Sequence, residues 1–415
     1  MLKSHKKTIL ETLGRSPIHP FPARMAPGIA LDALGESKTP LRVLDPMAGS
    51  GTVVAVARAN GHRAFGVDLD PLAVLLASVW TRTVNARRVN DTAAEVLAGA
   101  KEAFGLLPSR LAYPTGSDNE TRKFIRYWFD ENARRQLAAL SVAIGRVHDR
   151  ATRDVLWCGF SRLIITKQAG ASLAMDLSHS RPHRAFTHAP VKPFDRFIPV
   201  VQIVVSNCPQ SGSELLGPST VVKRGDARKL EIDDDSIDLV LTSPPYLNAI
   251  DYMRCSKFSL VWMGHNVGEL RQIRAESVGT EASSKQAMEA AWVQSLIRQL
   301  GLKPALASRD HALLATYAWD MGLALAEVSR VLRADGRAVY VVGDSMIRGT
   351  FVRNSAIVTT VAEKHGLLLH SRCSRTLPDN RRYLPPPNRG ATSAAMDSRM
   401  RREVVLSFTK SPVPY

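Results

Sequence analysis

Residues 41–52 read Leu-Arg-Val-Leu-Asp-Pro-Met-Ala-Gly-Ser-Gly-Thr, and this stretch decides the fold of the chain. Its first residues form a short apolar strand, Pro46 ends the strand, and an apolar helical pattern starts at Val53. A glycine-rich turn between a strand and a helix points backbone amides at a ligand. The spacing matches neither the G-x-G-x-x-G dinucleotide motif nor a Gly-Lys-Ser/Thr phosphate loop. We therefore expect an α/β fold with a different ligand at this turn.

Acidic residues follow the next predicted strands. Residues 64–67 form a second apolar strand that ends in Asp68, where a carboxylate can accept hydrogen bonds from both hydroxyls of a ribose. Asp226 follows a third strand at 220–222 and could contact an adenine amine. Any one acid at such a place is more often a cap or turn residue. Acids at successive strand ends, in this order, favour a ligand that contains a nucleoside.

Residues 242–246 read Thr-Ser-Pro-Pro-Tyr and follow the apolar strand 237–241. Each proline lacks an N–H and fixes φ, so the strand ends here and its carbonyls are left to accept hydrogen bonds from a ligand. Ser243 adds a hydroxyl acceptor, and Tyr246 adds a flat aromatic face. An ordinary strand-to-loop turn is the simpler interpretation. The combination nevertheless suits a planar group with an exocyclic amine, such as a nucleobase.

Together these motifs resemble those of the DNA methyltransferases that methylate exocyclic amines with S-adenosylmethionine. Residues 45–52 are similar to the cofactor-binding loop of that family, residues 67–73 to its ribose-binding strand end, and residues 242–246 to its catalytic motif. Residues 18–24 resemble the N-terminal segment that packs beside the cofactor. Residues 330–344 resemble the helix, turn and strand that follow the catalytic loop.

The resemblance covers residues 16–84 and 218–410 and implies both a fold and a set of site residues. The implied fold is Rossmann-like, that of a class I methyltransferase, with a mostly parallel seven-stranded sheet, an antiparallel last strand and a helical insertion. The implied catalytic residues are Ser243, Pro244, Pro245 and Tyr246. The implied cofactor-binding residues are Phe21, Pro22, Arg24, Asp45, Pro46, Ala48, Gly49, Ser50, Gly51, Thr52, Asp68, Leu69, Asp226 and Ala227.

Residues 85–215 form a far longer connection than neighbouring strands require. We expect a mainly helical insertion there, with good helix formers at 92–106, inside a catalytic domain made of residues 1–84 and 216–415. Around residues 122–129, aromatic side chains lie among Lys and Arg. These aromatics either fill the core of a small subdomain or stack on nucleic-acid bases, and opposite faces of one helix could serve both roles.

The charge of the chain favours a nucleic-acid partner. Lys and Arg number 55 against 38 acidic residues, which gives a formal charge of +17, and phosphate is the natural counter-charge. The C-terminal stretch is rich in arginine, including Arg372, Arg375 and Arg381, and a loop at 376–402 could grip the DNA backbone. Residues 178–193 contain histidines at no metal-binding spacing, so we interpret them as a basic loop that orders on the duplex and expect no metal.

Cysteine usage separates two mechanisms. Methylation of cytosine C5 requires a thiolate, conventionally after a proline, and none of the 4 cysteines follows a proline. Direct transfer to an amine needs no covalent intermediate. In the family that the chain resembles, serine at the position of Ser243 is typical of enzymes that methylate N4 of cytosine, whereas adenine-N6 enzymes carry Asp or Asn. We therefore expect a DNA methyltransferase that acts on N4 of a flipped cytosine.

Several alternatives stay open: an adenine-N6 DNA methyltransferase, an RNA base methyltransferase, and a non-enzymatic DNA-binding protein built on an inactive core. The expected partner is double-stranded DNA, and a cognate restriction endonuclease would complete a restriction-modification system. Either residues 247–332 or the insertion could read the DNA sequence. Because the chain has no long apolar run and no apolar core of a signal peptide at its start, we expect a cytoplasmic enzyme without a membrane partner.

Overall fold

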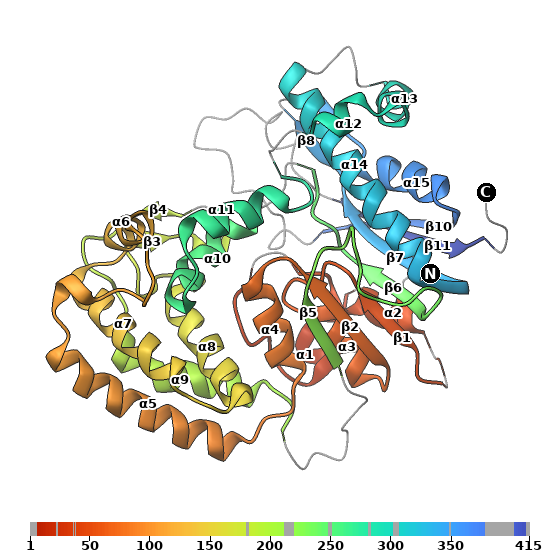
Figure 1. Cartoon of the computed structure of the whole chain (residues 1–415). Coiled ribbons are helices and arrows are strands. Elements are labelled where there is room, and N and C mark those ends of the chain that lie inside the picture. The colour runs from red at the N-terminus through yellow and green to blue at the C-terminus, as the bar shows by residue number, and fades with distance from the viewer. Residues whose placement is uncertain are drawn as a thin grey trace.

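A sheet with flanking helices lies beside a second, mainly helical group, as Figure 1 shows. The computed structural model describes residues 6–21, 24–35, 37, 39–179, 182–210, 220–247, 251–280, 284–301, 307–347, 350–377 and 402–411. Within these ranges, no helix has the length and apolar character needed to cross a lipid bilayer. The same residues include no cluster of His, Cys, Asp and Glu side chains that could hold a metal ion.

The sheet has seven strands. In their order across the sheet they are β5 (Thr220–Arg224), β2 (Arg63–Asp68), β1 (Arg42–Asp45), β6 (Ile237–Thr242), β7 (Leu332–Gly343), β11 (Arg402–Lys410) and β10 (Leu367–Thr376). The strands from β5 to β7 pair in parallel, whereas β11 pairs antiparallel with both β7 and β10. The predicted seven-stranded sheet, mostly parallel with an antiparallel last strand, is therefore confirmed.

Alternate residues of the central strands face two separate hydrophobic cores, as the pleat of a strand requires. The helices that cover the central strands include α2 (Pro27–Leu34), α3 (Thr52–Ala59), α14 (Ser308–Val331) and α15 (Asn354–Lys364). Val43 and Leu239 face the core that contains α2 and α3. Leu44 and Val240 face the core that contains α14 and α15. Burial on both faces fixes the register of the central strands, and with it the level at which each strand ends.

Between β2 and β5 the chain passes through α4 (Pro71–Thr81) and then through the helical group. That group contains α5 (Ala86–Leu106), η1 (Ser109–Leu111), α6 (Asn119–Trp128), α7 (Glu131–Gly145), α8 (Arg150–Ile164), β3 (Ala174–Met175), η2 (Leu177–His179), β4 (His183–Arg184) and α9 (Pro193–Ser206). The helix predicted over 92–106 is confirmed as part of α5. Asn85, Asp118, Asp130 and Asp149 cap α5, α6, α7 and α8 by accepting from a backbone amide.

The chain returns to the helical group after β6. There it forms α10 (Tyr252–Leu260), η3 (Val261–Met263) and α11 (Val267–Glu276), and it then continues through α12 (Lys285–Glu289) and α13 (Ala291–Gln299) to α14. Phe258 and Trp262 are buried in the same core as Phe129 of the insertion. The mainly helical region predicted over 247–332 is therefore confirmed, and its first part packs on the insertion.

Two further sequence predictions concern the C-terminal third of the chain. The strand expected at 403–408 is confirmed within β11. The turn expected between helix and strand falls within β7, where Asp335 has a φ of 62° and the register of the pairing with β6 shifts between Leu332 and Arg337. Most of the loop expected at 376–402, including Arg381, lies outside the described residues. A short ribbon of β8 (Ser345–Ile347) and β9 (Thr350–Val352) precedes α15.

The histidine-containing segment 178–193 is described except for residues 180 and 181. His183 lies in β4, where it pairs with Met175 of β3. Its Nδ1 atom lies 3.7 Å from Oδ2 of Asp176, so this part of the segment has a defined local structure in the free protein. Ordering of the segment on duplex DNA stays a prediction.

Candidate active site

The glycine turn after β1 packs tightly against α4. Gly49 and Gly51 have φ values of 51° and 85°, which favour glycine. A Cβ atom at Gly51 would lie 2.7 Å from the Cβ atom of Ala77 on α4, so a side chain there would force the two segments apart. The amide of Ala48 donates to the carbonyl of Val67 at 2.9 Å and joins the turn to β2. The turn is thus held in one shape between a helix and a strand.

Asp68, at the end of β2, accepts hydrogen bonds from two backbone amides. Gly49 donates to Oδ2 at 2.7 Å, and Asp70 donates to Oδ1 at 2.9 Å. Burial raises the pKa of Asp68, and these amide bonds oppose that rise. A carboxylate offers about four lone-pair sites, so Asp68 retains acceptor capacity for a ligand. The sequence predicts an acid at the end of the second strand. In the structure this acid, Asp68, lies beside the glycine turn.

Asp45 joins the end of β1 to the end of β6. Its Oδ1 atom accepts from the hydroxyl of Thr242 at 2.7 Å and from the amide of Met47 at 3.2 Å. Asp45 is 3% exposed, and burial raises its pKa to about 7. The first residue of the Thr-Ser-Pro-Pro-Tyr motif is therefore hydrogen-bonded to the first residue of the glycine turn, although the sequence separates them by 197 positions.

The N-terminal segment lies against the glycine turn, as the resemblance implies. Arg24 donates through Nε to the hydroxyl of Ser50 at 3.0 Å and also donates to the carbonyl of His19. The ring of Phe21 stacks on the ring of Tyr252, with centroids 5.7 Å apart and an interplanar angle of 2°. Pro22 lies outside the described residues. The described part of the segment closes one side of the turn with an aromatic pair.

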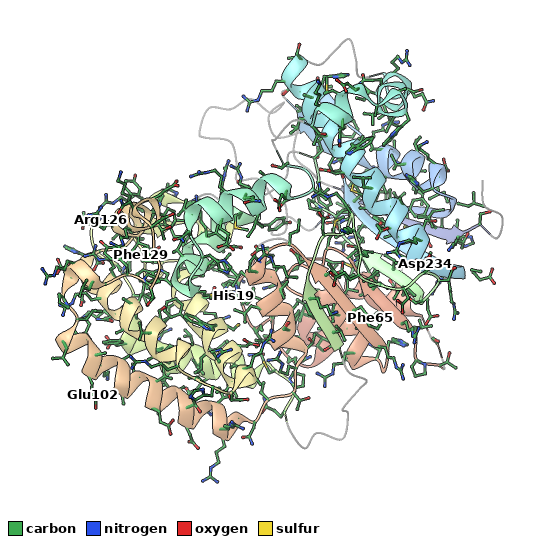
Figure 2. All side chains as sticks on the ribbon, in the orientation of Figure 1. His19, Phe65, Glu102, Arg126, Phe129 and Asp234 are labelled. Carbon is green, nitrogen blue, oxygen red and sulfur yellow. The ribbon has the colours of Figure 1, made fainter. Side chains whose placement is uncertain are left out.

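His19 lies between the sheet and the helical group, as its label in Figure 2 shows. Its Nε2 atom lies 2.9 Å from the hydroxyl of Ser161 on α8, which lies 2.9 Å from the hydroxyl of Ser259 on α10. Burial lowers the pKa of His19 well below its usual value. The sequence reasoning did not single out this contact, because Ser161 is separated from His19 by 142 residues.

Asp226 follows β5 as predicted, but its carboxylate is engaged by a residue that the sequence reasoning missed. Arg228 donates through Nε and Nη2 to both Asp226 oxygens, at distances of 2.7–3.1 Å. Nη1 of Arg228 donates to Asp320 at 2.7 Å, and Nη2 donates to the carbonyl of Glu276 at 2.5 Å. Any contact of Asp226 with an adenine amine would have to use its remaining lone pairs. That contact stays a prediction.

The other predicted cofactor-binding residues gather around the same turn. Pro46, Ala48 and Thr52 are buried, and Thr52 is the first residue of α3. Leu69 is half-buried next to Asp68, and Ala227 is 5% exposed next to Asp226. The turn after β1 lies between the ends of β2 and β6, because β1 is flanked by those strands. In open α/β sheets, ligands bind at such a point on the carboxyl edge of the strands.

The catalytic motif follows β6 at that edge. The hydroxyl of Ser243 donates to the carbonyl of Val341 at 3.1 Å and lies 3.2 Å from the hydroxyl of Tyr246. Pro244 is buried, while Ser243, Pro245 and Tyr246 are half-buried. A hydroxyl that donates its proton within the protein presents its lone pairs as acceptors. Ser243 can therefore accept a hydrogen bond from an amine while keeping this arrangement.

A buried ion pair on the last strands supports the tyrosine of the motif. The hydroxyl of Tyr246 donates to Oε1 of Glu403 at 3.3 Å. Oε2 of Glu403 accepts from Nε of Arg375 at 2.9 Å and from its Nη2 at 2.5 Å. The two residues face each other across β10 and β11, and their side chains are 8% and 9% exposed. Arg375 belongs to the arginine-rich C-terminal stretch, but in this buried position its side chain is unable to contact DNA.

The aromatic residues of α6 and its C-terminal end divide between core and surface. Phe129 is 1% exposed and packs on Trp262 with ring centroids 5.2 Å apart. Tyr127 is 53% exposed, and the guanidinium of Arg184 lies 5.4 Å from its ring centre. Figure 2 labels Arg126 at the outer edge of the same helix. The core role is confirmed for Phe129, and a nucleic-acid role for the outer face stays a prediction.

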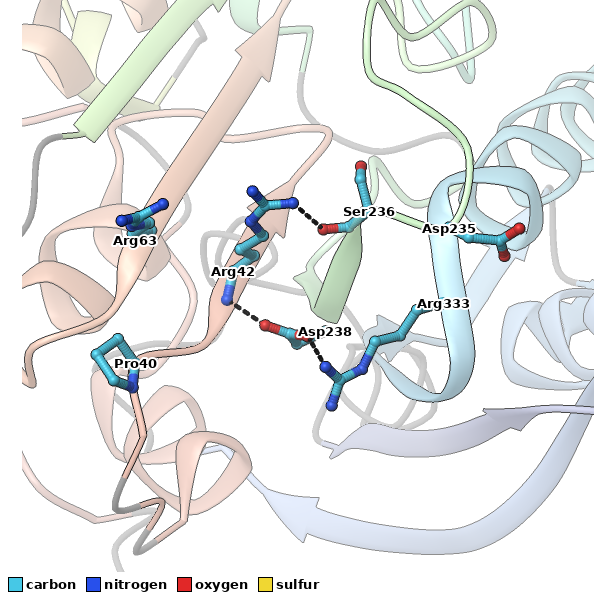
Figure 3. Close-up of a pocket in the computed structure, with 7 residues that line it drawn as sticks. All are labelled: Pro40, Arg42, Arg63, Asp235, Ser236, Asp238 and Arg333. Carbon is cyan, nitrogen blue, oxygen red and sulfur yellow. Dashed lines mark hydrogen bonds and ion pairs between the residues drawn. The ribbon is translucent and has the colours of Figure 1, made fainter.

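A surface depression of about 570 Å³ lies elsewhere and is drawn in Figure 3. It is lined by Pro40, Arg42, Arg63, Asp235, Ser236, Asp238 and Arg333. Arg42 and Arg63 are the first residues of β1 and β2, whereas Asp45 and Asp68 are the last. The depression is therefore at the amino edge of the sheet, opposite the candidate site. Asp238 already binds the amide of Arg42 at 2.6 Å and a guanidinium nitrogen of Arg333 at 2.5 Å.

Comparisons with known proteins give one sequence relative and several matches among solved structures. No family model matches the chain. The chain is 19% identical over 386 residues to the type II methyltransferase M.MvaI of Kocuria varians, and the match covers 88% of this chain and 84% of that protein.

Among solved structures, the chain is similar to a TehB-like S-adenosylmethionine-dependent methyltransferase of Corynebacterium glutamicum. The identity is 12%, the TM-score is 0.29, and the match covers 92% of this chain and 86% of that one. A proposed DNA modification methylase of Thermus thermophilus matches with 17% identity and a TM-score of 0.24, over 46% of this chain and 53% of that one. The chain is thus distantly related in sequence to a type II methyltransferase over most of its length.

Proposed function

We propose that this protein is a DNA methyltransferase that transfers a methyl group from S-adenosylmethionine to the exocyclic N4 amine of a flipped cytosine in duplex DNA. One observation carries the proposal above all. The Thr242–Tyr246 motif and the Asp45–Thr52 turn follow neighbouring parallel strands, and the Thr242–Asp45 hydrogen bond of 2.7 Å joins them. A methyl donor at the turn would therefore lie beside an amine held at the motif.

The cofactor is S-adenosylmethionine, and the residues around the turn fit it. Its ribose hydroxyls have an acceptor in Asp68, whose two amide contacts keep the carboxylate in place. The glycine turn offers backbone at close range, and Phe21 offers an aromatic surface beside Gly49, since a Cβ atom at Gly49 would lie 3.8 Å from the Phe21 ring. When bound, the cofactor supplies a methyl group on a positively charged sulfur. The distant relationship to a type II methyltransferase supports this choice.

The motif orients the amine for direct transfer. The hydroxyl of Ser243 and the carbonyl of Pro244 accept hydrogen bonds from the two N–H groups of the target amine. These hydrogen bonds direct the nitrogen lone pair at the methyl carbon. With the cofactor bound, the N–C bond would form as the S–C bond breaks, and the extra proton on nitrogen would leave to water. Holding the reacting atoms in line supplies most of the rate, so the motif needs no strong base. No cysteine of the chain is required.

Tyr246 holds the base itself. A flipped base loses its stacking at a cost of a few kcal/mol, and an aromatic face returns roughly 1–3 kcal/mol of it. The hydrogen bond from Tyr246 to Glu403 fixes the direction of the ring at the end of a half-buried loop. The formal charge of +17 gives the chain a general attraction for the phosphate backbone, which brings the base to this loop.

The test is to identify the product. The protein is incubated with unmethylated genomic DNA and cofactor carrying a labelled methyl group, and the DNA is digested to nucleosides for mass analysis. We expect labelled N4-methylcytosine from the natural protein, and almost none from a Ser243→Ala, Tyr246→Ala double variant that still binds the cofactor. Labelled N6-methyladenine would assign the same roles to the adenine reaction. Label found only with RNA, or DNA binding without any transfer, would overturn the proposal.

A further inference from the structure

The helices α10 and α11 form one unit with the insertion. The hydroxyl of Ser141 on α7 donates to the carbonyl of Trp262 at 2.6 Å. The hydroxyl of Thr121 on α6 accepts from the amide of Val267 at 2.9 Å and lies 3.1 Å from Oδ1 of Asn266. These bonds, together with the shared hydrophobic core, fix α10 and α11 on the helical group. Figure 1 shows the two helices on the side of that group nearest to the sheet.

Both ends of this pair of helices border the candidate active site. Tyr252, the first residue of α10, stacks on Phe21 beside the glycine turn. Glu276, the last residue of α11, accepts a hydrogen bond at its carbonyl from Arg228, which holds Asp226. The two helices therefore run along the candidate site from the glycine turn to Asp226.

That surface carries a group of cationic side chains, the α10–α11 cluster, made of Arg254, Lys257, Arg271 and Arg274. The side chains of Arg254, Arg271 and Arg274 are 48%, 62% and 40% exposed. Asp251 lies between two of them, with Oδ2 at 3.1 Å from Nε of Arg254 and 2.6 Å from Nε of Arg274.

Lys257 and Arg271 connect the cluster to α6. Nζ of Lys257 lies 5.2 Å from the ring centre of Phe124, and Arg271 pairs with Glu120. Burial lowers the pKa of Lys257 most, the three arginines of the cluster lower it further, and Asp251 opposes them. The ammonium group of Lys257 is thus partly desolvated and lies among like charges. An anion placed among these cations would offset both the desolvation of the ammonium group and its repulsion by the arginines.

The neighbouring helix α6 carries further positive charge. Arg122, Lys123 and Arg126 are exposed there, and the guanidinium of Arg122 lies 5.6 Å from the ring centre of Tyr113. Several cations close together suit a ligand with regularly spaced negative charges. Duplex DNA is such a ligand, since each strand carries one phosphate at about 3.4 Å intervals along the axis.

We propose that Arg254, Lys257, Arg271 and Arg274 bind phosphates of the DNA strand next to the flipped nucleotide, so that α10 and α11 form the DNA-facing edge of the insertion. The inference rests on the proposed function and names the surface through which that function meets its substrate. The insertion and the segment after the catalytic motif then act as one DNA-binding unit, because their helices share a core.

The experiment measures the salt dependence of binding to a fluorescent duplex of mixed sequence. The test variant is Lys257→Met, Arg271→Gln, in which methionine keeps the packing on Phe124. Each phosphate contact contributes a slope of about 0.9 to the plot of log affinity against log salt. We expect the slope to fall by about 1.8 and the affinity at 0.1 M salt to fall on the order of 50-fold.

The matched control is Arg87→Gln, Arg150→Gln, in the first turns of α5 and α8. These arginines are also exposed and also lie near acids, Arg87 at 3.9 Å from Asp91 and Arg150 at 4.0 Å from Asp154. The control removes the same charge from the chain, so it measures the effect of net charge alone. We expect its slope to stay within experimental error of that of the natural protein.

The outcomes separate this inference from the proposed function. If the test variant keeps the slope of the natural protein while the natural protein binds and methylates DNA, the inference is wrong and the function stands. If the natural protein binds no duplex at any salt concentration, the function itself fails. Should the double variant unfold, Arg271→Gln alone, on an exposed position, is expected to lower the slope by about 0.9, and an unchanged slope would again refute the assignment.

Discussion

The hydroxyl of Tyr246 donates a hydrogen bond to Oε1 of Glu403 across 3.3 Å, although the two residues are 157 positions apart in the chain. Glu403 is itself held by Arg375 on the neighbouring strand. The aromatic face proposed to receive the target base is therefore positioned by the last strands of the sheet. The cofactor turn lies on the other side of β6, after β1, so the two halves of the proposed reaction depend on different supports.

Removing that hydrogen bond should impair catalysis more than cofactor binding. We expect Tyr246→Phe to lower kcat/KM for DNA about tenfold, because a hydrogen bond to a charged group contributes about 1.5–3 kcal/mol and part of it is retained by ring packing. Glu403→Gln should lower it similarly, and the double variant should be no worse than the single ones. Tyr340→Phe is the control, since its hydroxyl has no hydrogen-bond partner among the described residues. Strictly additive losses would contradict the coupling.

Asp68 should decide the affinity for S-adenosylmethionine. Asp68→Ala removes acceptors for two ribose hydroxyls, and we expect at least a tenfold weaker Kd by calorimetry, given about 1.5–3 kcal/mol for each bond to a charged acceptor. Asp91→Ala, an exposed acid on α5, is the control and should bind normally. An Asp68→Ala protein that folds and binds the cofactor with natural affinity would remove Asp68 from the site.

Gly51 should tolerate no side chain. Its φ of 85° is unfavourable for alanine, and the new Cβ atom would lie 2.7 Å from that of Ala77. We expect Gly51→Ala to lower the free energy of unfolding by about 2–5 kcal/mol, since overpacking adds to the cost of the left-handed backbone. Gly116→Ala separates the two effects, because Gly116 has a φ of 80° and nothing within 4 Å of an added Cβ atom. Denaturant unfolding of both variants is the measurement, and equal losses would rule out the close contact.

The buried carboxyl of Asp45 should make stability depend on pH. Burial raises its pKa from 3.8 to about 7, so between these values the folded protein binds more protons than the unfolded chain. The contribution of Asp45 to stability therefore falls as the pH rises from about 4 to about 7. Asp45→Asn keeps an acceptor for Thr242 and removes the titration. For Asp45→Asn we expect the unfolding free energy to fall less steeply with pH than it does for the natural protein. The difference in slope is up to about 1.4 kcal/mol per pH unit.

The control for that comparison is Asp233→Asn, which changes an exposed acid in the turn before β6. Unfolding is measured in denaturant at several pH values for the three proteins. If the natural protein and Asp45→Asn show the same pH slope between pH 4 and 7, Asp45 is not the group that titrates. A changed slope in Asp233→Asn would attribute the effect to general surface charge.

The sequence predicted those parts of the candidate site that are local in the chain. The glycine turn, Asp68 and the Thr-Ser-Pro-Pro-Tyr motif each follow a short apolar strand, and strand ends in a parallel sheet meet at one edge. Composition and turn chemistry are enough to find such points. The parallel sheet with an antiparallel last strand followed from the resemblance that these motifs carry. The structure confirms that sheet.

The contacts that support the site could not be predicted, because they join residues with no common pattern. Arg375 belongs to an arginine-rich stretch, and only its pairing across β10 and β11 shows that it is buried against Glu403. Arg228 holds Asp226 and Asp320 together from a turn with no recognisable motif. The packing of α10 on the insertion is likewise a long-range contact. Charge and hydrophobicity along the sequence give no distances between such residues.

The position of β11 between β7 and β10 has a consequence for the order in which the site is completed during protein synthesis. A ribosome delivers the chain from its N-terminal end, and Glu403 emerges after every other residue of the candidate site. A nascent chain that has reached β7 already contains the glycine turn, Asp68 and the catalytic motif, but Tyr246 still lacks the carboxylate that orients it. Such a chain could capture the cofactor before it could hold a base. Methylation competence would then arrive only with the insertion of the final strand.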